Sequence, residues 1–143
     1  MTVKAILSTK GSEVITIEPT ATLETAIGVL TEHRIGVLVV LAPERRVMGI
    51  LSERDIVRAV AKQGAAALKE PLVQVMTRNV SNCNESETVS SLMEQMTTGK
   101  FRHLPVVERG RLIGIVSIGD VVKHRLTQMK GESEALRDYI QTA

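Results

Sequence analysis

An internal repeat constrains the fold of this 143-residue chain more than any other feature. Apolar residues follow the helical spacing i, i+3, i+4, i+7 from Leu23, and the same spacing begins again 66 residues later at Val89. After each of these predicted helices comes an apolar run typical of a buried strand, at 37–41 and at 103–107. Each copy is small for an independent core, so the two copies must pack together to bury enough apolar surface.

Each copy continues with a tight turn, a second strand and a second helix. The second strands are predicted at 47–51 and 112–116, and amphipathic helices open directly after them. Short leading strands are expected at 14–17 and 80–83. Each copy therefore reads strand, helix, strand, strand, helix, and the predicted fold class is α+β with two tandem β-α-β-β-α repeats packed through their sheets.

Three segments follow from this organisation. Residues 1–65 form the first repeat with its lead-in, and residues 66–130 form the second. Residues 131–143 begin at a glycine break and carry Leu136, Tyr139 and Ile140 at helical spacing, which predicts a separate amphipathic tail helix.

Composition and charge exclude several classes of function. No apolar stretch is long enough for a membrane span, and a single cysteine, Cys83, forms no intrachain disulfide, so we expect a reducing cytoplasm. The three histidines are scattered, and no metal site is expected. The formal net charge is only +2, the basic and acidic residues are interleaved, and aromatic residues are limited to Phe101 and Tyr139, which disfavours nucleic-acid binding.

Short motifs recur at equivalent positions of the two copies. A Gly-x-x-Ser-x-x-Asp segment ends at Asp55 and again at Asp120, the strand at 102–107 reads Arg-His-Leu-Pro-Val-Val, and Val-Met-Thr at 75–77 leads into the second copy. With these motifs the chain resembles a tandem pair of cystathionine β-synthase (CBS) domains, a Bateman module, of the stand-alone bacterial type. The resemblance implies two pseudo-symmetric clefts that bind AMP, ADP, ATP, NAD or S-adenosylmethionine, and a flat homodimer of two modules.

The repeated Ser-x-x-Asp segments are the first candidate binding residues. A carboxylate at a helix start, Asp55 or Asp120, can accept hydrogen bonds from the two hydroxyls of a ribose. The preceding serines, Ser52 and Ser117, lie where a hydroxyl and free backbone N–H groups can meet a phosphate. The same pattern is also a helix-capping arrangement worth about 1 kcal/mol, and the two roles are compatible.

Further site residues follow from the resemblance. It implies that Arg102 and His103 lie near the ligand phosphates. The corresponding positions of the first copy are Ile35, Gly36 and Val37. Because this stretch differs between the copies, we expect two inequivalent clefts.

The resemblance also implies that each cleft is completed by the lead-in of the other copy. Thr77 and Val80 would complete the Asp55 cleft, and Ser8 and Val14 the Asp120 cleft. Arg54 is either a phosphate contact or a solvated surface charge.

The predicted function is regulatory rather than catalytic, because no nucleophile paired with a base and no metal-ligand cluster is evident in the sequence. We expect a module that senses AMP, ADP, ATP or NAD(H) and signals by a conformational change, through a homodimer or an unidentified target protein. The alternative is a ligand-free dimerising adaptor.

Overall fold

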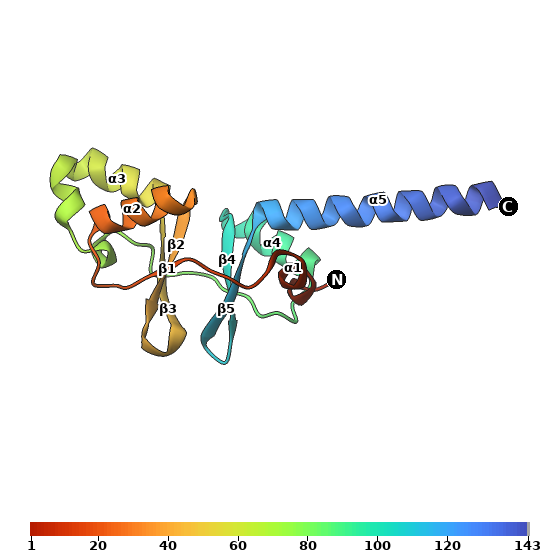
Figure 1. The fold of residues 1–143 in the computed structure, drawn as a ribbon, viewed down its shortest axis with the longest axis horizontal. Coiled ribbons are helices and arrows are strands. Elements are labelled where there is room, and N and C mark those ends of the chain that lie inside the picture. Colours follow the sequence, from red (N-terminus) through yellow and green to blue (C-terminus); the bar gives the residue numbers. More distant parts are fainter. Residues whose placement is uncertain (143) are drawn as a thin grey trace.

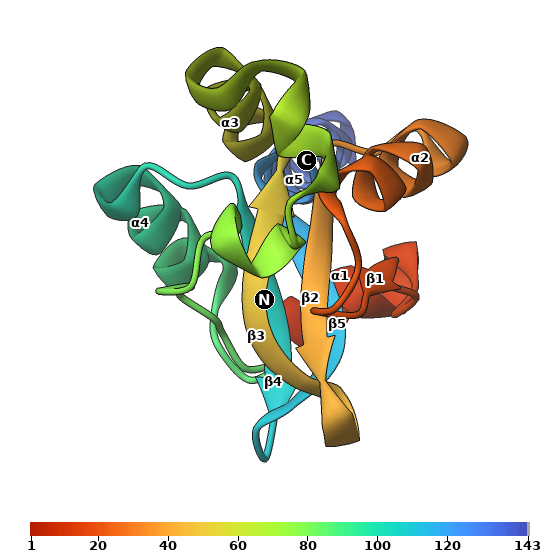
Figure 2. The same cartoon turned by 90° about the vertical axis from the view of Figure 1, so that its left-hand side faces the viewer.

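The two repeats lie side by side, and their hairpins join in one five-stranded sheet (Figure 1). The computed structural model describes residues 1–142. The strand order is β1-β2-β3-β5-β4, and the two repeats meet at the antiparallel pair Arg46 and Arg111 between β3 and β5. Figure 2 shows α2 and α3 at one end of the strands, the hairpin turns at the other end, and α4 and α1 on either side. The predicted α+β class with two packed repeats is confirmed.

The first repeat forms the predicted elements, with helix boundaries set by capping. Helix α2 begins after Thr22, whose hydroxyl accepts the N–H of Thr25 at 3.2 Å, and it ends at Arg34, which is left-handed with φ 54°. The elements are β1 (Thr16–Ile17), α2 (Leu23–His33), β2 (Val37–Ala42), β3 (Arg46–Ser52) and α3 (Glu53–Gln63). Short 3-10 turns lie at Pro43–Arg45, Gly64–Lys69 and Leu72–Gln74.

The second repeat reproduces this plan with one difference. Thr88 caps its first helix and Lys100 ends it with φ 56°, as Thr22 and Arg34 do in the first repeat. The predicted strand at 80–83 is wrong, because Cys83 makes only an isolated parallel bridge to Val106. The elements are α4 (Val89–Gly99), β4 (His103–Glu108), β5 (Arg111–Ser117) and α5 (Ile118–Thr142).

The two repeats exchange their leading segments. Helix α1 (Val3–Lys10) packs its buried residues Val3, Ile6 and Leu7 into the core of the second repeat. In the other direction, Ala67, Leu72 and Met76 complete the core of the first repeat. Figure 1 shows both connections crossing between the halves. The boundary between the two cores therefore does not coincide with a single point at residues 65/66. Each core contains a segment from the other half of the sequence.

A glycine in each second strand makes room for the exchanged segment. A Cβ on Gly49 would lie 2.6 Å from the carbonyl oxygen of Thr77, and a Cβ on Gly114 would lie 2.8 Å from a methyl carbon of Leu7. At the first of these contacts the backbones of Ile50 and Thr77 exchange two hydrogen bonds, of 2.9 and 3.0 Å. The motif glycines are therefore required for close packing between the repeats.

The C-terminal helix does not break at Gly131. Helix α5 runs without interruption from Ile118 to Thr142 and projects far beyond the sheet (Figure 1). A glycine inside a helix costs about 1 kcal/mol, which the helix-forming residues on both sides offset. The expected separate tail helix at 131–143 is therefore an extension of α5, with Ala143 outside the described residues.

Cys83 is buried at 2% exposure and carries no disulfide. Burial, with the negative charge of Glu87 as a smaller cause, raises the pKa of its thiol to about 12. Cys83 is thus a small apolar residue of the second core. None of the helices within residues 1–142 has the length and apolarity needed to cross a membrane.

Truncating a buried methionine should lower the stability of the fold more than truncating an exposed one. Met96 is 3% exposed and Met129 is 55% exposed. We expect Met96→Ala to lower the free energy of unfolding by about 2–5 kcal/mol, as should Leu30→Ala in the first core, because both leave cavities. Met129→Ala should change it by less than about 0.5 kcal/mol. Urea denaturation measures all three, and equal effects for the two methionine variants would contradict the assigned core.

The glycine contact between the repeats gives a second test. Gly49→Ala should destabilise the fold by about 1–3 kcal/mol, because the added methyl group collides with the backbone of the exchanged segment. Gly28→Ala in α2 is the matched control, since nothing lies within 4 Å of its Cβ, and it should leave stability unchanged or slightly raised. Thermal unfolding followed by circular dichroism compares the variants, and a fully stable Gly49→Ala protein would contradict the close approach.

Candidate functional site

The Ser-x-x-Asp motif of the first repeat forms the junction between β3 and α3. The Ser52 hydroxyl accepts the N–H of Asp55 at 3.2 Å, and Asp55 Oδ2 accepts the N–H of Ser52 at 2.9 Å. This reciprocal pair is a capping box. The second repeat has the same two bonds between Ser117 and Asp120, at 3.1 and 2.9 Å. The capping role is therefore present in both repeats, and it holds each carboxylate in a defined position.

The lead-in of the second repeat brings Thr77 to the Asp55 carboxylate. The Thr77 hydroxyl donates to Asp55 Oδ1 at 3.2 Å, and its backbone is paired with Ile50 on β3. Thr77 thus meets Asp55 across 22 residues of sequence, as the resemblance to CBS domains implied. The group that contacts Asp55 is a neutral hydroxyl, and within residues 1–142 no ammonium or guanidinium forms an ion pair with this carboxylate.

Asp55 borders a cavity of about 580 Å³ that both repeats line. Ligand pockets typically have volumes of about 300–1,000 Å³. Most of the predicted site residues meet here: Gly36, Val37, Ser52, Arg54, Asp55, Thr77, Val80, Arg102 and His103. Sequence reasoning did not assign to the site seven further lining residues, Ile50, Glu53, Asn79, Ser81, Gly99, Lys100 and Phe101. Several of them flank predicted residues directly, so extending each predicted segment by one or two positions would have found them.

Positive charge predominates among the charged lining residues. Arg54, Lys100 and Arg102 supply three cations, against the carboxylates of Glu53 and Asp55. Arg102 and Lys100 come from the second repeat, whereas Arg54 and both carboxylates come from the first. The cavity can therefore offer a carboxylate acceptor for hydroxyl groups and cations for an anionic group.

His103 lies at the start of β4, where it is half-buried and lines the cavity. Burial lowers its pKa below the ordinary value of 6.5, and the positive charges of Lys10 and Arg102 lower it further. The carboxylate of Asp120 acts in the opposite direction. The imidazole is therefore neutral at pH 7, and it is available to gain a proton if an anion binds nearby.

The surroundings of Asp120, where the second cleft was expected, are arranged differently. The Lys10 ammonium, not a hydroxyl, contacts Asp120 Oδ2 there at 2.6 Å. Ser8, the residue expected at this position, donates its hydroxyl to the carbonyl of Lys4 within α1, and Val14 is half-buried in the following segment. Ile35 borders a separate hollow between α2 and α3 rather than the cavity between the repeats.

Partial burial acts to raise the pKa of Asp120, but hydrogen bonds outweigh it. Lys10 donates to this carboxylate through its ammonium and Ser117 through its backbone N–H, and the pKa falls below the ordinary 3.8. Asp120 is therefore ionised and paired at neutral pH.

Comparison with known proteins agrees with this architecture. A crystal structure of a CBS-domain protein from Agrobacterium tumefaciens is 50% identical, with a TM-score of 0.82, covering 87% of this chain and 92% of that one. A CBS domain protein from Pyrobaculum aerophilum complexed with AMP is 28% identical, with a TM-score of 0.75 and coverage of 84% and 89%. The CBS domain pair of protein MJ0100, in complex with 5′-methylthioadenosine and S-adenosylmethionine, is 28% identical, with a TM-score of 0.77 and coverage of 91% and 98%.

The sequence model of the CBS domain matches twice, at residues 3–62 and 72–127. These two matches take in most of the chain and coincide with the two repeats of the fold. The chain is therefore a member of the CBS-domain family, with two such domains in tandem.

Proposed function

We propose that this protein is a regulatory module that binds an adenine nucleotide in the cavity between its two CBS domains. The observation that carries the proposal is the Asp55 carboxylate, held by its capping box at the edge of a cavity of about 580 Å³. A carboxylate in this setting suits the two hydroxyls of a ribose. Two related structures have adenosine-containing ligands, AMP in one and 5′-methylthioadenosine with S-adenosylmethionine in the other.

The charges lining the cavity favour a phosphorylated ligand. Arg54, Lys100 and Arg102 can pair with phosphate oxygens, whereas the sulfonium of S-adenosylmethionine would add a fourth positive charge. We therefore propose AMP, ADP, ATP or NAD(H) as the ligand class. Ser52 would orient the ligand without reacting, because its hydroxyl is already engaged with Asp55. The proposed role is binding and not catalysis.

A ligand that contacts both repeats would signal by changing the relative orientation of the two repeats. It can do so only to the extent that it binds one arrangement more tightly than another. We propose a cytoplasmic homodimer that passes this change to a target protein. Apolar side chains exposed on α5 are consistent with such contacts, namely Val122, Leu126, Met129, Leu136, Tyr139 and Ile140.

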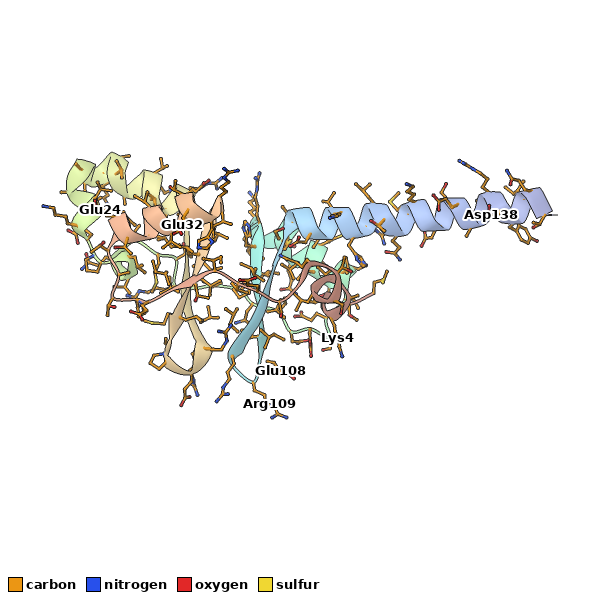
Figure 3. All side chains as sticks on the ribbon, viewed as in Figure 1. Lys4, Glu24, Glu32, Glu108, Arg109 and Asp138 are labelled. Carbon is orange, nitrogen blue, oxygen red and sulfur yellow. The ribbon has the colours of Figure 1, made fainter. Side chains whose placement is uncertain are left out.

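Replacing the motif carboxylate should weaken binding. Hydrogen bonds to a charged group are worth about 1.5–3 kcal/mol, so Asp55→Asn should raise the dissociation constant about 10- to 100-fold while keeping the cap largely intact. Asp138→Asn, near the far end of α5 (Figure 3), is the matched control and should bind as the wild type does. Calorimetric titration with AMP, ADP, ATP, NAD(H) and S-adenosylmethionine measures both variants.

Two results of that titration would count against the proposal. Unchanged affinity in Asp55→Asn would remove Asp55 from the site. Absence of binding by all five compounds to folded, nucleotide-free protein would favour the dimerising adaptor, which the exposed apolar face of α5 also supports.

The titration of His103 gives an independent test of the phosphate. Its pKa lies below 6.5 in the free protein because of burial and nearby cations. A bound phosphate near Arg102 should stabilise the imidazolium and raise this pKa, so binding of AMP should strengthen as the pH falls towards 6. Uncharged 5′-methylthioadenosine should leave the pKa nearly unchanged. NMR titration of the histidine ring protons measures the shift, and equal responses to the two ligands would contradict phosphate binding at this place.

A further inference from the structure

The two clefts share one plan but differ in the residue that meets the motif aspartate. In both, the exchanged segment from the other half reaches the second strand of the repeat and the carboxylate next to it. Thr77 does this in the Asp55 cleft through a hydroxyl and its backbone, and Lys10 does it in the Asp120 cleft through an ammonium. The sequence motif alone conceals this difference, because Ser-x-x-Asp is present in both repeats.

Lys10 is held at this place by a packed helix. It is the last residue of α1, and its Nζ donates to the carbonyl of Ile115 at 2.9 Å as well as to Asp120 at 2.6 Å. Leu7, one turn earlier, lies against Gly114 on the same strand. The Lys10 side chain is only 30% exposed. The strand and the carboxylate together therefore position its ammonium.

The ion pair changes what Asp120 can bind. A ribose presents two neutral hydroxyls, and a charge-assisted bond from an ammonium is about twice as strong as a bond between neutral groups. A ribose entering this cleft must compete with a tethered cation for the carboxylate, whereas at Asp55 it competes with the Thr77 hydroxyl. The Lys10 ammonium contacts the carbonyl of Ile115 on the strand and the Asp120 carboxylate at the same time.

We propose that Lys10 closes the Asp120 cleft to adenosine-containing ligands, so that each chain binds one ligand, at Asp55. This inference rests on the proposed function and adds a specificity-determining residue to it. Inequivalence between the clefts is thus traced to a single side chain of the N-terminal helix.

Binding stoichiometry tests the proposal, with AMP as the probe in calorimetry. Wild-type protein should bind one AMP per chain, and Lys10→Met, which keeps the aliphatic stem and removes the ammonium, should bind two. Lys4→Met on the exposed side of the same helix (Figure 3) is the matched control and should bind one. Asp55→Asn should weaken the single site about 10- to 100-fold, and Lys10→Met combined with Asp55→Asn should bind one AMP tightly, in the opened cleft.

Two AMP molecules per wild-type chain would overturn the proposal, even if Lys10→Met failed to fold. A folded Lys10→Met protein that still binds only one AMP would also overturn the proposal, if adding Asp55→Asn weakens that binding. Both results leave AMP binding at Asp55 intact, and therefore overturn only the role of Lys10. Absence of AMP binding by the wild type and by every variant would instead reject the proposed nucleotide site, and the closed cleft with it.

Discussion

The exchange of leading segments between the two repeats is the contact on which the rest of the structure depends. Each repeat has one helix before its hairpin and one after it, and neither core is complete without residues from the other side of the chain. The exchange requires close backbone approach, which Gly49 allows for Thr77 and Gly114 allows for Leu7. Because each exchanged segment ends beside a motif aspartate, the packing that completes the cores also builds the two clefts.

The same exchange makes the clefts different. Pseudo-symmetry places the ends of two unrelated segments at equivalent positions, and their side chains are not equivalent. The Thr77 hydroxyl is a neutral partner for Asp55, which borders a cavity also lined by three cationic side chains, whereas Asp120 is paired with the Lys10 ammonium. The Asp55 carboxylate therefore lines a cavity together with cations from both repeats, whereas the Asp120 carboxylate holds the end of the N-terminal helix.

Local patterns in the sequence predicted the elements well but predicted long-range partners poorly. The helices after Thr22 and Thr88 and the four hairpin strands followed from spacing and from the repeat. The placement of Thr77 beside Asp55 followed from the resemblance to CBS domains. The break expected at Gly131 was wrong, because one glycine with open space around it costs less than the surrounding helix-forming residues contribute. Lys10 was not assigned to a site, because nothing local to α1 indicates that it reaches a carboxylate 110 residues away.

The most direct test of this account is a crystal structure of the protein with the tightest-binding of AMP, ADP, ATP, NAD(H) and S-adenosylmethionine. The account predicts one nucleotide per chain, with its ribose hydroxyls on Asp55 and its phosphates beside Arg102 or Arg54, while Lys10 remains paired with Asp120. A nucleotide bound at Asp120, or one that lies outside the cavity between the repeats, would contradict it.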